Sequence, residues 1–486
     1  GANNTAVGRN SLRVNTTGNY NVSMGYNSLD ANTTGANNTA VGYNALTANT
    51  TAGQNTAVGY NALQANTASD NTAVGKGALN SNTTGTYNTA VGQAALADNT
   101  TTNHNTAVGY NCLASNTTGE INTAVGSRAL DVNTTGYANV AIGHDAMGAA
   151  TTGDRCTAVG SYALDAALTG NDNTAIGNEA GSAVTSGANN TALGSYSLRY
   201  CTTSSDNTAV GKSAGTNIVG SNNTVVGSIA MSSNTTGGNN TAVGKSALQQ
   251  NTTADNNTAV GYNALYWNTG ADNVAVGSHA LDANTTGRMA VAVGKDSLGA
   301  NTTGEFNVAI GREAMASNTT GSYNTAVGLN ALSSNTTADG NIAIGRNALV
   351  NNTTGTYNTA VGYNSLVLNT TTDYNTAIGS LTLAANVANA NTAVGYNVLN
   401  DNTTGTRNTA VGMAALDSCT TGSYNTSIGA YSLSAGVTGD SNIAVGDNAM
   451  YDLTSGSHNI AVGNNVLDEI TDGIRNTAVG SGAMSA

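Results

Sequence analysis

Residues 38–54 read N-T-A-V-G-Y-N-A-L-T-A-N-T-T-A-G-Q, and residues 55–63 start the same phrase again as N-T-A-V-G-Y-N-A-L. The phrase recurs along the whole chain, and each copy is numbered from its anchor glycine as position 0, from Gly8 to Gly480. Consecutive anchors lie 17 residues apart, except at four steps of 16. A unit this short cannot bury a core alone, so the repeat predicts an array in which neighbouring units stack.

The residues of the unit favour a β-solenoid over a helical array. Helical repeats need about 30 or more residues per unit. Asn, Thr and Gly have low helix propensity, whereas T-A-V and A-L segments between Asn and Gly corners suit short strands. We therefore expect an all-β fold: one continuous parallel β-solenoid (β-roll) of about 29 turns over residues 1–486, with turns about 4.8 Å apart.

Individual columns of the repeat predict distinct structural tasks. The anchor glycine predicts a corner with positive φ or a close backbone approach. Position −4 is Asn except at Cys156 and Ala290, which predicts an amide ladder between turns. Position +4 is Leu or Met except at Gly181 and Gly215. Positions +7 to +10 usually read N-T-T-G, while +5, +6, +11 and +12 vary freely.

The T-A-V strand is apolar on both faces, which is unusual for a strand with one side in water. Side chains alternate along a strand, so positions −2 and −1 point to opposite faces. If Ala and Leu fill the lumen, the aliphatic column at −1 needs a partner surface. We expect identical solenoids to associate laterally about a common axis. The alternative is that all three aliphatic columns line one lumen. The predicted interface residues are Val7, Val41, Val58, Val74, Val91, Val108, Val125 and Ile142.

Charge and hydropathy exclude several partners. Charged residues make up 8% of the chain, the net charge is −13, and proline is absent. There is no basic stripe, so we expect no nucleic-acid partner. There is no apolar run of about 18 residues, so we expect no membrane insertion. The four cysteines fall in widely separated turns, which predicts buried thiols rather than a disulfide framework.

The sequence offers no pattern typical of catalysis or of cofactor binding. The four histidines lie in distant turns and cannot form a metal cluster or a triad. The calcium-binding nonapeptide and the phosphate-binding loop are both missing. No pair of carboxylates is singled out as a glycosidase would need. We therefore expect no catalytic, cofactor-binding or metal-binding residue, and no enzyme.

Tyrosine is the one variable feature with binding character. Tyr26, Tyr43 and Tyr60 occupy position +1 in three consecutive turns, so their rings should stack along the solenoid. Exposed aromatic side chains often anchor recognition, and these three form the candidate ligand-contact ladder. Packing between stacked corners explains the same column without a ligand.

The repeat also resembles known fibrous families. The units at 38–52 and 55–63 are similar to repeats of phage and algal-virus tail fibres. The segments N-T-A-I-G-N-E-A-G at 173–181 and N-T-A-V-G-K-S-A-G at 207–215 resemble the head repeats of trimeric autotransporter adhesins, although the period of 17 is longer. The resemblance implies a parallel trimeric β-roll with a stalk or adhesive role.

These observations together predict a structural fibre. We expect the shaft of a virion tail fibre or a cell-surface adhesin, located outside the cell, that presents or contributes to attachment to a host receptor or glycan. Neither end has the pattern of a capping unit, so flanking domains or end-to-end stacking are expected. The alternatives are a self-stacking extracellular filament, an ice- or polysaccharide-binding solenoid, and a depolymerase fibre. Ice-binding faces need T-x-T on one strand face, whereas this strand reads T-A-V.

Overall fold

The computed structural model describes residues 1–485 and has the expected architecture, an all-β parallel solenoid built on the 17-residue repeat. Its regular elements are 29 strands of three residues each, and the described residues contain no helix. The chain forms two compact units, residues 1–242 and the residues from Val243 onward.

The strands coincide with the T-A-V segments of the repeat. From the amino terminus, the strands up to the boundary of the two units are β1 (Thr5–Val7), β2 (Val22–Met24), β3 (Thr39–Val41), β4 (Thr56–Val58), β5 (Thr72–Val74), β6 (Thr89–Val91), β7 (Thr106–Val108), β8 (Thr123–Val125), β9 (Val140–Ile142), β10 (Thr157–Val159), β11 (Thr174–Ile176), β12 (Thr191–Leu193), β13 (Thr208–Val210), β14 (Thr224–Val226) and β15 (Thr241–Val243). The others are β16 (Thr258–Val260), β17 (Val274–Val276), β18 (Val291–Val293), β19 (Val308–Ile310), β20 (Thr325–Val327), β21 (Ile342–Ile344), β22 (Thr359–Val361), β23 (Thr376–Ile378), β24 (Thr392–Val394), β25 (Thr409–Val411), β26 (Thr426–Ile428), β27 (Ile443–Val445), β28 (Ile460–Val462) and β29 (Thr477–Val479).

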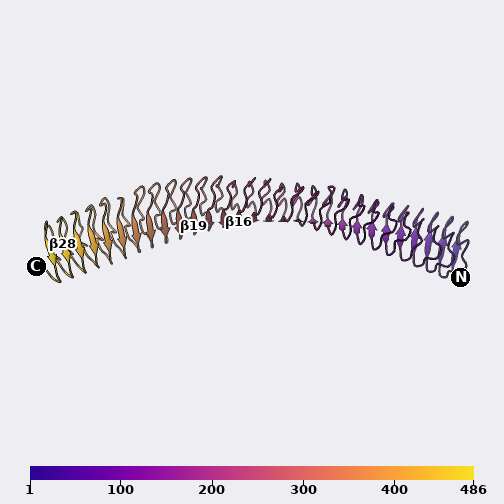
Figure 1. Cartoon of the computed structure of the whole chain (residues 1–486), viewed down its shortest axis with the longest axis horizontal. Helices are drawn as coiled ribbons and strands as arrows, with labels where there is room; N and C mark the ends of the chain where they lie inside the picture. The colour runs from indigo at the N-terminus through magenta and orange to yellow at the C-terminus, as the bar shows by residue number, and fades with distance from the viewer. Residues whose placement is uncertain (486) are drawn as a thin grey trace. The chain divides into compact units, whose positions relative to one another are not determined.

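Within each unit, neighbouring strands are parallel and belong to consecutive turns (Figure 1). The register aligns equivalent repeat positions, so Ala57 pairs with Ala40 on one side and with Ala73 on the other. Backbone pairing continues beyond the strand, since the Leu46 N–H donates to the Ala62 carbonyl at 3.1 Å. A short strand is therefore sufficient, because hydrogen bonds between turns run around much of the coil.

The lumen is filled by the columns at −2, +3 and +4. Ala40, Ala45 and Leu46, which occupy these positions in one turn, are all fully buried. Positions −3 and −1 of the same strand face outward. Of the two arrangements expected from the alternation, the structure has the one with Ala and Leu inside and Val or Ile outside.

Both reasons expected for the anchor glycine apply. Gly42 has a φ of 139°, a conformation that residues with a side chain rarely adopt. A Cβ atom placed there would collide with the carbonyl oxygen of Gly59 in the next turn. The anchor is therefore glycine in every turn because of its own backbone and because of its neighbour.

The leucine column at +4 has an unexpected backbone conformation. Leu46 has a φ of 52°, in the left-handed region, and the equivalent Leu or Met in other turns has the same conformation. This conformation costs about 1–2 kcal/mol for a residue with a side chain. The cost is offset because complete burial of a leucine contributes about 1.5–3 kcal/mol. The periodicity of the sequence carried no sign of it.

Two asparagine columns hold consecutive turns together. At −4, the Asn38 backbone N–H donates to the Asn21 side-chain oxygen at 3.0 Å. At +7, Asn49 Nδ2 donates both to Asn32 Oδ1 at 3.0 Å and to the Ala52 carbonyl at 3.0 Å. The predicted ladder at −4 exists, but it mainly accepts backbone N–H groups. The longest amide-to-amide ladder runs along +7, where the side-chain amide of one turn donates to that of the turn before.

The +7 column, here called the corner column, changes character along the chain. Runs of asparagine alternate with runs of buried apolar or cysteine side chains. In two turns the buried corner residue is at +8 instead of +7, and these residues are Leu168 and Val437. The first unit begins with Asn15, Asn32, Asn49, Asn66, Asn82, Asn99, Asn116 and Asn133, and continues with Ala150, Leu168, Val184, Cys201 and Ile218. The second unit has asparagine at this position up to Asn402, followed by Cys419, Val437 and Leu453.

Three of the four 16-residue turns omit one residue from the N-T-T-G segment at an asparagine corner and thereby interrupt the corner ladder. Asn66 donates to the carbonyl of Ala68, two residues ahead, at 2.7 Å. It makes no bond to the preceding Asn49, whose Oδ1 has no hydrogen-bond partner. The deletion therefore preserves the strand register but removes one hydrogen bond between neighbouring corner residues.

Candidate interaction surfaces

The first candidate surface is the outer strand face, formed by positions −3 and −1 of the strands. Position −3 is Thr, Val or Ile in every turn, and no charged residue occurs at −3 or −1 in any of the 29 strands. The chain has 14 basic and 27 acidic residues, all of them in other columns. This face is therefore uncharged and almost entirely β-branched, and its outward sequence is T-x-V rather than T-x-T.

The predicted interface residues all lie on this face. Val7 is 53% exposed and Ile142 is 40% exposed. The remaining members are exposed or half-buried, and these are Val41, Val58, Val74, Val91, Val108 and Val125. The structure thus places all eight in one outward column, and their contact with another copy stays a prediction.

The tyrosine ladder stacks as the spacing predicted. The ring centroids of Tyr26 and Tyr43 lie 5.3 Å apart with planes at 10°, and those of Tyr43 and Tyr60 lie 5.2 Å apart at 8°. The Arg9 guanidinium lies 5.8 Å from the Tyr26 centroid at the other end. Most ring faces are therefore turned toward a neighbouring side chain, so the three rings do not form an open platform. Their role as ligand contacts stays a prediction.

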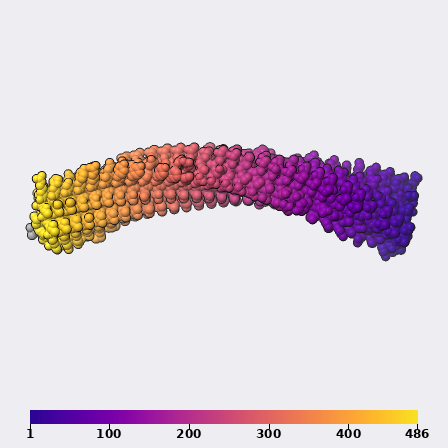
Figure 2. All heavy atoms as spheres, viewed as in Figure 1, coloured from indigo at the N-terminus to yellow at the C-terminus, as the bar shows by residue number. Residues whose placement is uncertain are grey.

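A second kind of surface is a set of hollows between the columns at +1 and +2 and the columns at +5 and +6. The side chains at +3 and +4 between them point into the lumen, which leaves a concave wall. In the space-filling view, side chains of successive turns line up in rows along each unit (Figure 2). The hollows are lined by the variable columns of the repeat, so their chemistry differs from turn to turn.

The hollow beside Tyr60 is called the Tyr60 groove. It measures about 250 Å³ and is lined by Tyr60, Asn61, Lys76, Gly77, Asn80, Gln93, Ala94 and Ala97. Lys76 and Gln93 are exposed. Asn61 Oδ1 and Asn80 Oδ1 have no hydrogen-bond partner. The groove combines an aromatic ring, a cation and several amides, and sequence reasoning identified only its tyrosine.

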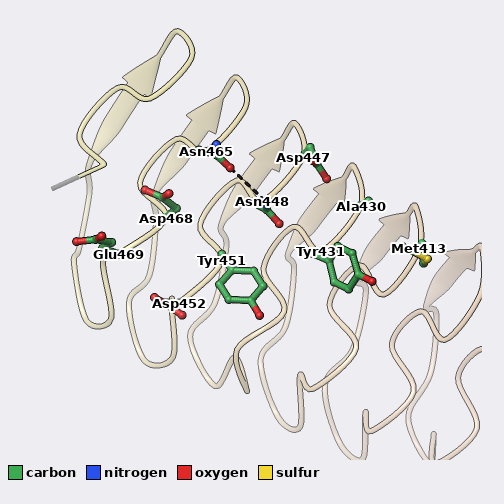
Figure 3. Close-up of a pocket in the computed structure, with 10 residues that line it drawn as sticks. All are labelled: Met413, Ala430, Tyr431, Asp447, Asn448, Tyr451, Asp452, Asn465, Asp468 and Glu469. Carbon is green, nitrogen blue, oxygen red and sulfur yellow. Dashed lines mark hydrogen bonds between the residues drawn. The ribbon is translucent and has the colours of Figure 1, made fainter.

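The second unit has a hollow of about 720 Å³ in the equivalent columns, here called the acidic groove (Figure 3). Figure 3 shows Tyr431 and Tyr451 in its central part and the hydrogen bond from Asn448 to Asn465, which is 3.1 Å long. Its lining is Met413, Ala430, Tyr431, Asp447, Asn448, Tyr451, Asp452, Asn465, Asp468 and Glu469. Four carboxylates and no cation line this groove.

Carboxyl groups at position +5 are partly removed from water. Burial raises the pKa of Asp131, Asp165, Asp282 and Asp417, all of which occupy this position. Asp165 also lines a third hollow, of about 300 Å³, with Tyr162, Glu179 and Ser182. A polar group in these concave walls is therefore less hydrated than one on a flat surface.

The cysteines and histidines lie where the sequence placed them, in separated turns. All four cysteines are buried and unpaired. Burial raises the pKa of the Cys112 thiol to about 12 and that of Cys419 to about 12. Across residues 1–485, no cluster of three or more His, Cys, Asp or Glu side chains could hold a metal ion. No helix long and apolar enough to cross a membrane occurs in the same residues.

When the chain is compared with known proteins, no family model matches it and no curated protein matches its sequence.

Proposed function

We propose that the chain is the shaft of a fibre, outside the cell or on a virion, in which three copies lie side by side through their outer strand faces. The observation that carries the proposal is the exclusion of charge from positions −3 and −1 in all 29 strands. A long exposed apolar surface on a soluble protein commonly marks an interface. The proposed role is mechanical, and it keeps an attachment tip away from its base.

The occupant of this face is a second copy of the chain. A column of side chains that repeats once per turn is covered evenly only by a surface with the same repeat. Another solenoid of this sequence has that spacing, the same apolar rows and no charge to bury. The number three rests on the likeness of the repeat to trimeric adhesin heads and to tail-fibre repeats.

The test is the mass of the native particle, measured by light scattering coupled to size exclusion. Three copies of 48.1 kDa are expected, and a particle of one copy contradicts the proposal. The triple variant Val91→Glu, Val108→Glu and Val125→Glu should lower the mass to that of one copy, because three carboxylates would otherwise be buried at the interface.

A matched control carries the same charge elsewhere in the same turns. Thr101, Thr118 and Thr135 are exposed at position +9, so replacing them with Glu should leave the mass unchanged. Equal dissociation by both triple variants would indicate general repulsion and contradict the assignment of the face. Incubation of the shaft with bacterial or algal polysaccharides should release no oligosaccharide, and release would favour a depolymerase.

A further inference from the structure

The Tyr60 groove has a ring with one uncovered face. Tyr43 covers one side of Tyr60 at 5.2 Å, while position +1 of the next turn is Lys76 rather than an aromatic residue. In the described part of the chain, no ring or guanidinium is stacked on the other side of Tyr60. The tyrosine is 50% exposed. An exposed aromatic face of this kind can pack against the C–H face of a pyranose ring.

The cation of the groove is free to bind an anion. Lys76 is exposed and forms no ion pair with any residue from 1 to 485. It belongs to a distinctive column, since all four lysines of the chain occupy position +1 and Asp447 is the only acid there. In a chain with a net charge of −13, this concentrates positive charge along one corner. A carboxylate bound at Lys76 would form a charge-assisted hydrogen bond.

The floor of the groove exists because small residues replace asparagine at position +2. In the first turns the amide of Asn10 donates to Asn27 at 3.0 Å, and that of Asn27 donates to Asn44 at 3.3 Å. The column of asparagines at +2 ends at Asn61, since the next two turns have Gly77 and Ala94. A Cβ atom at Gly77 would meet nothing within 4 Å. Gly77 and Ala94 therefore leave a space beside the tyrosine.

Two residues that line this space each have a buried side-chain oxygen without a hydrogen-bond partner. Buried polar atoms in proteins are nearly always hydrogen-bonded, so each exception needs an explanation. Asn61 Oδ1 and Asn80 Oδ1 have no partner, and both residues line the groove. Gln93 places a third amide at the rim. Amide groups donate and accept, which suits the hydroxyl groups of a sugar.

We propose that the Tyr60 groove binds a carboxylated sugar residue of an acidic glycan. Tyr60 packs against the pyranose face, Lys76 binds the carboxylate, and Asn61, Asn80 and Gln93 bind hydroxyl groups. The volume of about 250 Å³ is below the range of about 300–1,000 Å³ typical of sites for larger ligands. The groove therefore fits one sugar residue, with the rest of the glycan outside it. This activity goes beyond the proposed shaft function.

The acidic groove provides an internal contrast. It also contains tyrosines and amides, but Asp447 stands at +1 where the Tyr60 groove has Lys76. Asp452, Asp468 and Glu469 line its opposite wall. The carboxylates of the groove repel the carboxylate of a sugar, so we expect no binding of a carboxylated sugar in the acidic groove. One site per chain is therefore expected.

The test is calorimetric titration of the full chain with an oligogalacturonate and, separately, with its methyl ester. The ester has the same sugar but no charge. The acid is expected to bind at one site per chain, and the ester about tenfold more weakly, because one charge-assisted bond is lost. Equal binding of the two, or no binding of the acid, overturns the proposal.

Two variants with a matched control localise the site. Lys76→Gln should weaken binding of the acid about tenfold and remove the preference over the ester. Tyr60→Ala should weaken both ligands, and thermal unfolding checks that each variant is folded. Lys212→Gln is the control, since Lys212 is also at +1 but has Ser195 and Ser228 in the turns on either side. Equal loss in the control means general charge attraction and overturns the site.

The mass measurement separates this proposal from the shaft function. A particle of three copies without binding of the acid overturns the groove alone. A particle of one copy that binds the acid at one site overturns the shaft alone and supports the groove.

Discussion

The first unit contains two kinds of turn that share one backbone and differ at the corner column. From Asn32 to Asn133 the corner is an amide that donates to its own turn and, except at Asn66, to the previous turn. From Ala150 to Ile218 the corner is apolar or cysteine, and it is equally buried. The comparison shows that the corner column can be stabilised either by hydrogen bonds or by packing. Each kind of corner restricts which residue types can occupy the neighbouring positions.

In two of the apolar turns, the change at the corner is matched by a change at the leucine column. Gly181 replaces leucine in the turn where Val184 replaces asparagine, and Gly215 is matched by Ile218. A Cβ atom at Gly215 would lie 2.6 Å from Ile218 Cδ1. The larger corner side chain thus fills the volume that the leucine occupies elsewhere, as close packing requires.

In the amide turns, each corner oxygen needs a donor from the corner residue of the next turn. Asn402 Oδ1 has no partner in the structure, because the next corner residue is Cys419 and supplies no amide. Elsewhere, buried polar residues that replace the usual alanine also occur in pairs. Ser23 at −2 bonds to Ser28 at +3 in the same turn, at 2.8 Å. A buried polar group therefore persists where a partner accompanies it.

The largest expected difference between the two kinds of turn comes from truncation to alanine. Asn116 donates to Asn99 Oδ1 at 3.2 Å and to the Gly119 carbonyl at 2.8 Å, and it accepts from Asn133 at 3.0 Å. Asn116→Ala leaves these groups unpaired and should lower the free energy of unfolding by about 4 kcal/mol. The matched Val184→Ala removes only packing and should cost about 2 kcal/mol.

Denaturant unfolding of both variants measures this difference. Equal costs would mean that the amide ladder contributes no more than packing does, which contradicts the comparison.

The pairing of Gly215 with Ile218 gives the second prediction. Gly215→Leu overfills the corner and should cost about 3 kcal/mol. Adding Ile218→Asn rebuilds the consensus Leu and Asn pair, so the double variant should regain about 2 kcal/mol. A double-mutant cycle from unfolding midpoints measures the coupling. Additive costs would show that the two positions are independent.

Restoring the ladder should stabilise the second unit by a smaller amount. Cys419→Asn supplies the missing donor to Asn402 Oδ1 and should raise the free energy of unfolding by about 1.5 kcal/mol. Cys419→Ala removes the thiol without supplying a donor and should not raise it. Thermal unfolding of the two variants distinguishes hydrogen bonding from simple loss of the cysteine, and stabilisation by alanine would contradict the ladder account.

The last prediction is a loss of stability at alkaline pH that comes from the buried cysteines. Burial raises the pKa of the Cys419 and Cys112 thiols from 9.0 to about 12. The unfolded chain therefore loses these protons first, so their contribution is fully present below about pH 9 and is lost as the pH rises toward about 12.

A Cys112→Ala and Cys419→Ala variant should lose less stability across this interval than the parent chain. Unfolding midpoints at pH 8, 9.5 and 11 measure the difference, and parallel curves would contradict the assignment. The native thiols should also resist alkylation at about pH 8, since the thiolate is the reactive form.

The sequence predicted the solenoid because its pattern needs little tertiary information. The period, the anchor glycine and the strand segments repeat without interruption from Gly8 to Gly480. Alternation of side chains also indicated which strand positions face the lumen. The stacking of Tyr26, Tyr43 and Tyr60 followed from their spacing of one repeat, because residues one repeat apart are neighbours in space.

The Tyr60 groove could be predicted only in part. The replacement of asparagine by Gly77 and Ala94 at +2 was visible in the sequence, but its effect depended on which columns flank a concave wall. The leucine at +4 that points into the lumen behind this wall has a left-handed φ. Neither propensity nor periodicity predicts leucine in that conformation.

By itself, the sequence determined the fold class, the repeat length and the strand positions, because these depend on residues within one turn and on exact repetition. The tertiary structure alone decided which asparagine column forms the amide ladder, where that ladder breaks, and which variable residues meet in a groove. The physical reason is that these features depend on the orientation of side chains between neighbouring turns. Burial and hydrogen bonding across the coil set that orientation.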